Sequence, residues 1–250
     1  ASVNVGGIVA SSLGISDASF FSGNYHFSGG GQGAVVNQGR ISAAHGSYVA
    51  LIGPSVSNQG TIAVGGGAAA LGAGAAVDMT LAGHTLETFQ VSAAAANALV
   101  SNGGAIRVGG GRVILSAQAM NTLLQTAVNN TGVISADSAV DSGGTITLLA
   151  SGGAVQAGGQ ISASSKGGAG GNVAIGGSSV AVDAGARILA SGASAGGSIE
   201  IGGSLHGGDL PLATTTTVGA GALLNASATV KGNGGRIQVV SDVSNAASTT

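Results

Sequence analysis

One serine lies in a pattern associated with nucleophilic catalysis. The segment GASAG at 192–196 fits the G-x-S-x-G nucleophile elbow, in which Ser194 would attack an acyl carbon. That elbow requires a strand before it and a helix after it, whereas GGSIEIGG follows here with the alternating apolar residues of a strand. We therefore interpret the segment as a turn between two strands and predict no catalytic residue.

A pair of acids could support a different chemistry. Asp137 and Asp141 are close in sequence, and paired carboxylates cleave glycosidic bonds in many enzymes. Their position favours solvated residues of a turn, and the chain has only nine acidic residues in total, which disfavours hydrolysis. A carbohydrate-active enzyme, a lyase or hydrolase acting on a host or matrix polysaccharide, stays open as the alternative function.

Metal, phosphate and nucleic-acid sites have little support. The Gly-rich segment GGAGGNVAI at 167–175 lacks the carboxylates of calcium-binding repeats, and GGGQGA at 29–34 precedes a strand instead of the helix that would bind a phosphate. There is no cysteine, and the net charge is −2. No metal-ligand spacing such as H-x-H or HExxH joins the four histidines, which are His26, His45, His84 and His206. We expect no metal, no cofactor and no nucleic-acid partner.

The elements that hold these residues follow an internal repeat. VVNQGRISA at 35–43 recurs almost unchanged as VSNQGTIAV at 56–64. A Val followed six positions later by Ile or Leu occurs seven times, as Val35/Ile41, Val56/Ile62, Val100/Ile106, Val128/Ile134, Val155/Ile161, Val182/Ile188 and Val218/Leu224. Successive units start 21, 44, 28, 27, 27 and 36 residues apart, counted between these valines. The interval of 44 contains residues 75–91, which we interpret as an inserted hairpin. We expect one further coil beside it, in which the repeat pattern is weak.

Each unit also predicts a second strand after a glycine or glycine pair. These strands are 48–52, 112–116, 145–149, 172–176, 198–202 and 236–240, and each has apolar residues at alternate positions. Apolar residues form 44% of the chain but aromatic residues only 2%, so the interior must be narrow and aliphatic. Short strands in units of 21 to 28 residues predict an all-β solenoid, a parallel β-helix whose coils stack at about 4.8 Å.

An asparagine follows the repeated Val by two positions in the first four units. These residues are Asn37, Asn58, Asn102 and Asn130, and the corresponding positions of the later units hold Ala157, Ala184 and Ala220. An amide at the same turn of consecutive coils can donate to one neighbour and accept from the other. We interpret the four asparagines as a structural ladder inside the stack.

The outward positions beside the repeated Ile bear on the enzymatic alternative. Catalytic carboxylates would have to converge on one outer face of the solenoid. The predicted outward column reads Ser42, Ala63, Arg107, Ser135, Ser162, Leu189 and Asn225, and it contains no pair of acids.

Several segments together resemble a known family. VNVGGIVASSLGI at 3–15, VALIGPSVSNQGTI at 49–62, VDMTLAG at 77–83 and GNGGRIQVVSD at 232–242 are similar to the N-terminal secretion domain of filamentous haemagglutinin-like exoproteins of two-partner secretion. The likeness spans nearly the whole chain. It departs from the family at Val240, where many members have Trp, and the family's Asn-Pro-Asn-Gly export box is not in this sequence.

The resemblance implies a right-handed parallel β-helix with an extra hairpin, which residues 75–91 would supply. It also implies export of the unfolded chain through an outer-membrane barrel with periplasmic POTRA domains. The parent protein would be an adhesin, haemagglutinin or related virulence factor, secreted or held at the surface of a Gram-negative bacterium, and its receptor is not specified.

We therefore expect one monomeric β-helical secretion domain over residues 1–250, a fragment without its N-terminal cap and downstream shaft. It would act by folding and binding, not by catalysis. A purely structural adhesin shaft is a further alternative, disfavoured because a shaft repeat has no reason to contain VNVGGIVAS.

Overall fold

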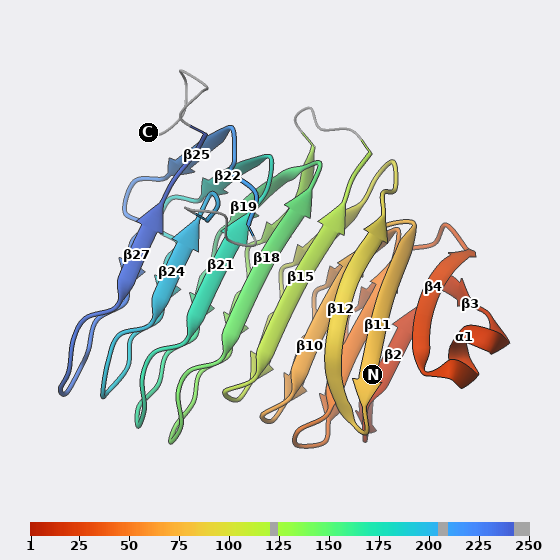
Figure 1. Cartoon of the computed structure of the whole chain (residues 1–250), viewed down its shortest axis with the longest axis horizontal. Coiled ribbons are helices and arrows are strands. Elements are labelled where there is room, and N and C mark those ends of the chain that lie inside the picture. The colour runs from red at the N-terminus through yellow and green to blue at the C-terminus, as the bar shows by residue number, and fades with distance from the viewer. Residues whose placement is uncertain (121–124, 205–209, 243–250) are drawn as a thin grey trace.

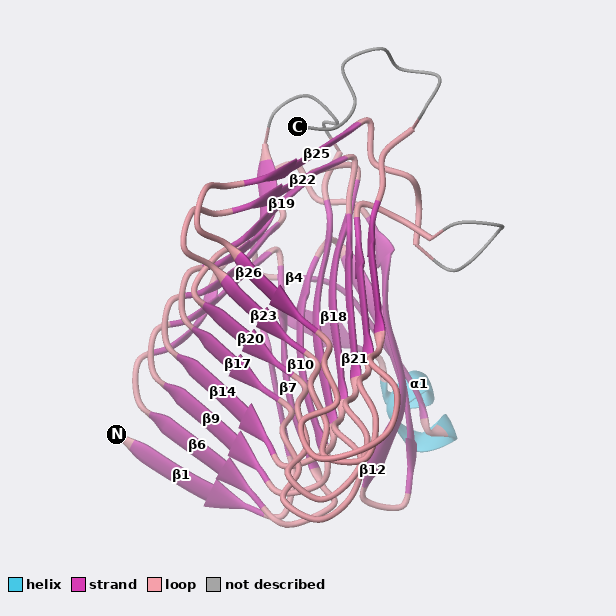
Figure 2. Cartoon of the chain, turned by 90° about the vertical axis from the view of Figure 1, so that its left-hand side faces the viewer, coloured by secondary structure: helices cyan, strands magenta, loops and turns pink. Residues whose placement is uncertain are grey.

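The computed structural model describes residues 1–120, 125–204 and 210–242, which form a long stack of coils with three walls (Figure 1). Figure 2 looks along the stack and shows the three parallel sheets around a narrow interior, with a further layer outside one wall. The predicted parallel β-helix is confirmed. Among the residues described, no helix is both long and apolar enough to cross a membrane.

Each wall takes one strand from every coil, except that the third wall takes none from the first coil. In spatial order, sheet A contains β1 (Ser2–Val5), β6 (Arg40–Ala43), β9 (Thr61–Val64), β14 (Ala105–Val108), β17 (Val133–Ser135), β20 (Gln160–Ser162), β23 (Arg187–Leu189) and β26 (Leu223–Asn225). Sheet B contains β2 (Ile8–Ser11), β7 (Tyr48–Gly53), β10 (Ala68–Ala73), β15 (Arg112–Gln118), β18 (Thr145–Ser151), β21 (Asn172–Gly176), β24 (Ser198–Ile201) and β27 (Arg236–Val239). Sheet D contains β25 (Thr215–Val218), β22 (Ser179–Val182), β19 (Ala154–Ala157), β16 (Thr126–Asn130), β13 (Leu99–Asn102), β8 (Ser55–Asn58) and β5 (Val35–Asn37).

The outer layer is a fourth, antiparallel sheet. Sheet C contains β12 (Thr85–Ala93), β11 (Ala76–Ala82), β4 (Asn24–Gly30) and β3 (Leu13–Ile15), with the short helix α1 (Asp17–Ser22) between β3 and β4. Strands β11 and β12 form the inserted hairpin, which confirms the excursion predicted at 75–91.

Stacking aligns like residues in columns, as the repeat predicts. In sheet A the inward column is Val3, Ile41, Ile62, Ile106, Ile134, Ile161, Ile188 and Leu224. In sheet B the alternate apolar residues of the predicted strands form two further columns, one of which is Ala10, Leu51, Leu71, Leu115, Leu148, Ile175, Ile201 and Val239. The outward column beside the isoleucines is also in the predicted register.

The predicted register of sheet D is wrong in its last two coils. Val155 is aligned with Val180, and Val182 is aligned with Ala157. Four positions separate Ala157 from Ile161, but six separate Val182 from Ile188, because the later corner contains an extra turn at Gly185 with φ of 71°. This longer corner reproduces the Val-to-Ile spacing of six by coincidence.

The interval of 44 residues is also a single coil. Val56 pairs directly with Val100, so no weak coil lies between them. The coil instead runs through β8, β9 and β10, leaves the stack as the β11–β12 hairpin and returns at β13. Strand β10, with the sequence AAALGA, is the element that the repeat search missed, because its small residues carry a weak apolar pattern.

Glycines at two corners let the coils come close together. At the corner between sheets D and A, a Cβ on Gly60, Gly104, Gly132 or Gly159 would overlap the carbonyl oxygen of the glycine one coil below. A second column, at the corner before sheet B, shows the same overlap at Gly111, Gly144, Gly171, Gly197 and Gly235. Much of the high glycine content is therefore required by coil-to-coil contact and does not indicate disorder.

We predict that Gly104→Ala destabilises the domain, whereas Gly103→Ala does not. The added methyl at residue 104 would meet the backbone of Gly60, while at residue 103 the nearest atom is Thr131 Oγ1 at 3.8 Å. Forcing a methyl into a packed site costs about 1–3 kcal/mol. Denaturant unfolding of both variants measures the difference, and equal stabilities would contradict this account of the corner.

Candidate functional site

The structure brings the four sequence-predicted asparagines together in one column of sheet D. Nδ2 of Asn37 donates to Oδ1 of Asn58, and the same bond joins Asn58 to Asn102 and Asn102 to Asn130, each at 2.7 Å. The last amide donates to the carbonyl oxygen of Gly158 at 2.6 Å. Every link therefore runs in the same direction along the stack.

These hydrogen bonds matter for stability because the asparagine side chains are buried away from water. Asn58, Asn102 and Asn130 are fully buried, and Asn37, in β5 at the end of sheet D, is 7% exposed. Beyond them the column continues with Ala157, Val182 and Val218, not with Ala184 and Ala220 as the sequence predicted. Ala184 and Ala220 lie in the longer corner, because the register shift moves valine into the column.

The candidate catalytic groups occupy turns. Ser194 lies between β23 and β24, and its amide donates to the carbonyl of Gly168 in the coil below. The segment around it is followed by a strand, as predicted.

Only one of the two aspartates, Asp141, is solvated as predicted. Asp141 is exposed, but the carboxylate of Asp137 accepts hydrogen bonds from the hydroxyls of Ser135 and Ser162 and from the amide of Ser164. Asp137 therefore joins two coils. Asp137 follows β17 and lies outside the outward column of sheet A, which contains no acid.

The histidines and the Gly-rich segment do not form a common site. His26 Nδ1 lies 2.5 Å from Asp78 Oδ1 across β4 and β11. Among the described residues no group of three potential metal ligands gathers, and His206 lies outside those residues. The Gly-rich segment 29–34 begins in the last two residues of β4 and leads to β5, which is a strand and not a helix.

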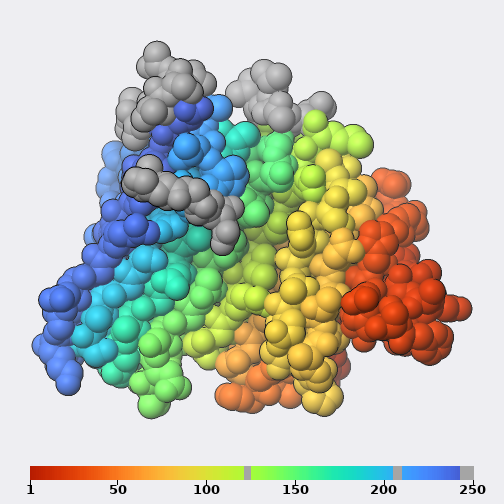
Figure 3. All heavy atoms as spheres, viewed as in Figure 1, coloured from red at the N-terminus to blue at the C-terminus, as the bar shows by residue number. Residues whose placement is uncertain are grey.

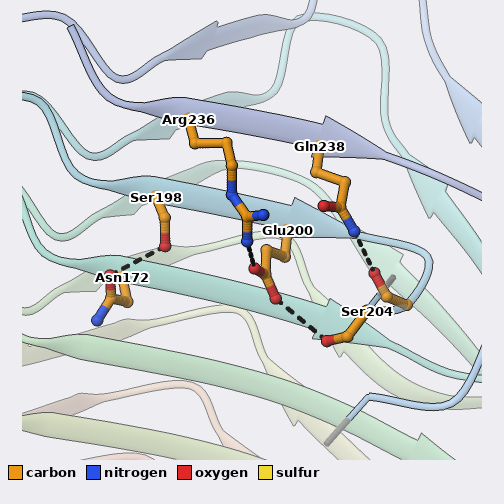
Figure 4. Close-up of polar contacts among 7 residues, drawn as sticks. Asn172, Ser198, Glu200, Ser204, Arg236 and Gln238 are labelled. Carbon is orange, nitrogen blue, oxygen red and sulfur yellow. Dashed lines mark hydrogen bonds and ion pairs between the residues drawn. The ribbon is translucent and has the colours of Figure 1, made fainter. Parts of the chain in front are cut away.

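The outer face of sheet B changes character along the stack. Toward the C-terminal end it is polar, with Ser198 bonded to Asn172 and an ion pair between Arg236 and Glu200 (Figure 4). Ser204 and Gln238 extend this group, since Ser204 donates to Glu200 and Gln238 donates to the carbonyl of Gly203. Toward the N-terminal end, sheet C packs on the outer face instead.

A second apolar cluster lies between sheets B and C. Sheet B contributes Ala50, Ile52 and Ala70, and sheet C contributes residues that include Met79 and Val91. Aromatic residues occur only between residues 20 and 89, in or beside this layer, and the main core among the described residues consists of Val, Ile, Leu and Ala alone. Burial raises the pKa of the Tyr48 phenol at the margin of this cluster.

Sequence reasoning missed most of this outer layer. The hairpin was predicted, but β3, α1 and β4 were not. Signals for α1 were present, since Ser16 caps the helix by accepting from the amide of Ser19, and Gly23 ends it with φ of 75°. The confinement of the aromatic residues to one part of the chain was the signal for a separate core.

We expect Asn102→Ala to lower the free energy of unfolding by about 2 kcal/mol or more. The substitution leaves a buried donor on Asn58 and a buried acceptor on Asn130 without partners, each costing roughly 1–3 kcal/mol. Ser101→Ala, on the opposite face of the same strand, is the control and should be close to neutral. Similar urea midpoints for the two variants would refute a stabilising role for the amide column.

The His26–Asp78 contact predicts that the stability of the fold changes with pH in the acid range. Burial alone would raise the pKa of Asp78, but hydrogen bonds from Ser92 and His26 and the charge of His26 hold it below the ordinary value of 3.8. The contact therefore stabilises the fold above the unfolded pKa, and this stabilisation is lost as pH falls through the lower folded pKa. Asp78→Asn should be less stable than the wild type at about pH 5 but not at about pH 2. Thermal melting across that range tests this, and a difference independent of pH would contradict it.

Comparison with known proteins agrees with the sequence resemblance. The family model of the TPS secretion domain matches residues 1–163. The crystal structure of the HMW1 secretion domain from Haemophilus influenzae matches with a TM-score of 0.81 and 29% sequence identity, over 99% of this chain and 69% of that chain. No curated protein matches the sequence.

The family defines the setting in which the fold operates. A TPS domain belongs to a two-partner secretion system, in which an outer-membrane transporter is the partner. The route leads across the outer membrane of a Gram-negative bacterium to the cell surface or the medium. The chain belongs to the TPS secretion domain family and is the secretion domain of a two-partner secreted exoprotein.

Proposed function

We propose that this domain acts without catalysis, by folding coil upon coil as it leaves its transporter. The observation that carries the proposal is the continuous aliphatic interior, in which side chains such as Ile106, Ile134 and Ile161 are fully buried by their neighbours in adjacent coils. A single coil cannot bury these side chains by itself. Each coil that emerges thus gains stability only by stacking on the previous one.

Stacking outside the cell would favour outward movement. Fully burying one Val, Leu or Ile side chain contributes about 1.5–3 kcal/mol, and each coil buries several. Return of a stacked coil to the transporter would require these contacts to break. Folding therefore favours outward movement of the chain, and this export needs no nucleotide hydrolysis.

The transporter in this proposal is an outer-membrane barrel with periplasmic POTRA domains, which receives the chain unfolded. The absence of cysteine supports that route, since no disulfide can form before export. The asparagine column has a structural role, fixing the register of the first coils through bonds that a slipped coil could not make.

The proposal includes one monomeric β-helical domain over the whole chain. Its support is the continuity of sheets A and B, which run from β1 and β2 to β26 and β27. The parent exoprotein is an adhesin or haemagglutinin-like protein. No observation favours the polysaccharide-cleaving alternative, because the outward column of sheet A contains no pair of acids.

The test compares an inward charge with an outward one in the same coil. Ile134→Asp places a carboxylate in the aliphatic interior and should abolish or strongly reduce secretion, whereas Thr131→Asp, at an exposed corner, should be secreted normally. Secreted and cell-retained protein are measured in cells with and without the transporter. Normal secretion of Ile134→Asp would show that coil stacking does not drive export.

A further inference from the structure

Asparagine followed directly by glycine occurs twice in the chain, at Asn102–Gly103 and at Asn233–Gly234, and a second glycine follows each pair. In such a pair the backbone nitrogen of the glycine can attack the side-chain amide carbon of the asparagine. Glycine favours this attack because it has no Cβ in the way and a permissive backbone. The two local sequences are nearly the same, so a difference in their reactivity must come from the fold.

The fold holds both reacting groups of the first pair. Asn102 is fully buried, and its side-chain amide accepts from Asn58 and donates to Asn130, each at 2.7 Å. The attacking nitrogen, on Gly103, donates its hydrogen to the carbonyl oxygen of Asn58 at 2.9 Å. Ring closure at Asn102 would have to break these buried hydrogen bonds, each of which is costly to leave unmade.

The second pair lies at the corner before β27, at one end of the stack (Figure 1). Figure 3 shows the last coil, in dark blue, at the edge of the molecule. Asn233 and Gly234 are both exposed, and a Cβ on Gly234 would meet no atom within 4 Å. Within the described part of the chain, neither the side-chain amide of Asn233 nor the backbone nitrogen of Gly234 makes a hydrogen bond. Both reacting groups are therefore accessible to each other and to water.

The stacking of the coils explains why the nitrogen of Gly234 has no partner. Gly234 lies two residues before β27, and a glycine occupies the same place before β18, β21 and β24. In each of those corners the glycine nitrogen donates to a carbonyl oxygen of the following coil at 2.9 Å, in the pairs Gly143 to Ala169, Gly170 to Ala195 and Gly196 to Asn233. Strand β27 is the last strand of sheet B among the residues described, so no further coil supplies this acceptor.

We propose that Asn233 deamidates spontaneously in the folded domain, whereas the amide column protects Asn102. The nitrogen of Gly234 gives its proton to water or hydroxide and attacks Cγ of Asn233, and ammonia leaves as the succinimide ring closes. Water then opens the ring at either carbonyl. The product is aspartate, or isoaspartate with one additional carbon in the main chain. Water is the only other reactant, and the inference does not depend on the proposed function.

The protection of Asn102 exists only in the assembled stack. In the unfolded chain both pairs are open to reaction. An aspartate at residue 102 could still accept from Asn58, but it would have no hydrogen to donate to Asn130 and would place a charge in the buried column. A chain that reacts at Asn102 before it folds should therefore no longer form a stable stack.

The experiment incubates the folded domain at mildly alkaline pH and follows both pairs by peptide mass spectrometry, which detects an acid in place of the amide. We expect Asn233 to react more than about tenfold faster than Asn102, because reaction at Asn102 must wait until the column opens. In urea the two asparagines should react at similar rates. Equal rates in the folded domain would overturn the proposal, and so would an Asn233 that reacts in urea but not in the folded domain.

Gly234→Ala is the matched control. The added methyl has room at this corner, and it restricts the backbone and obstructs the attack. We expect it to slow the reaction at Asn233 more than about tenfold and to leave the melting temperature nearly unchanged. An unchanged rate would show that the nitrogen of residue 234 is not the attacking group.

Refolding gives a separate test of the protected pair. Wild-type chain is held in urea until part of it has reacted at each asparagine, and it is then diluted into buffer. The folded fraction should be depleted of molecules with an acid at residue 102 but not of those with an acid at residue 233. Equal proportions in the folded and unfolded fractions would contradict the role of the column at Asn102.

Discussion

The close approach of successive coils is the constraint on which the rest of the structure depends. Parallel ladders hold each strand one strand spacing from its neighbours, and at the corners the backbone must follow the same path without interference. Glycine at Gly60, Gly104 and Gly132 permits this, since any side chain there would meet the carbonyl below. The aliphatic columns and the amide column both exist because the corners keep the coils in register.

The same constraint explains why the aromatic side chains lie outside the interior of the β-helix. The space inside three walls of short strands accepts Val, Ile, Leu and Ala in vertical alignment, and a ring in one coil would displace the coils on either side. The layer between sheets B and C has no such repeat. Phe27 and Phe89 can therefore pack there against small residues such as Ala70, and the chain acquires a second core with a different composition.

How much of this the sequence predicts depends on whether a feature repeats. The isoleucine column, the second strand of each unit and the four stacked amides follow from residues that recur at fixed spacing. The shift at Val180 could not be predicted in this way, because a corner lengthened by two residues makes Val182 match the spacing in place of the true partner. Strand β10 was not predicted for the opposite reason, since its alanines align with the neighbouring strands but give only a weak apolar pattern in the sequence. The layer formed by α1, β3 and β4 occurs once, so repetition gave no information about it.

The common direction of the amide bonds has a consequence for a partly assembled stack. If coils are added from the first toward the last, the newest asparagine always presents a free donor to water, and the arriving coil replaces that water with its own oxygen. The sequence of exchanges ends where Asn130 reaches the main-chain carbonyl of Gly158. From there on Ala157, Val182 and Val218 occupy the column, and the end that receives the next coil changes from a polar, hydrated surface to an apolar one.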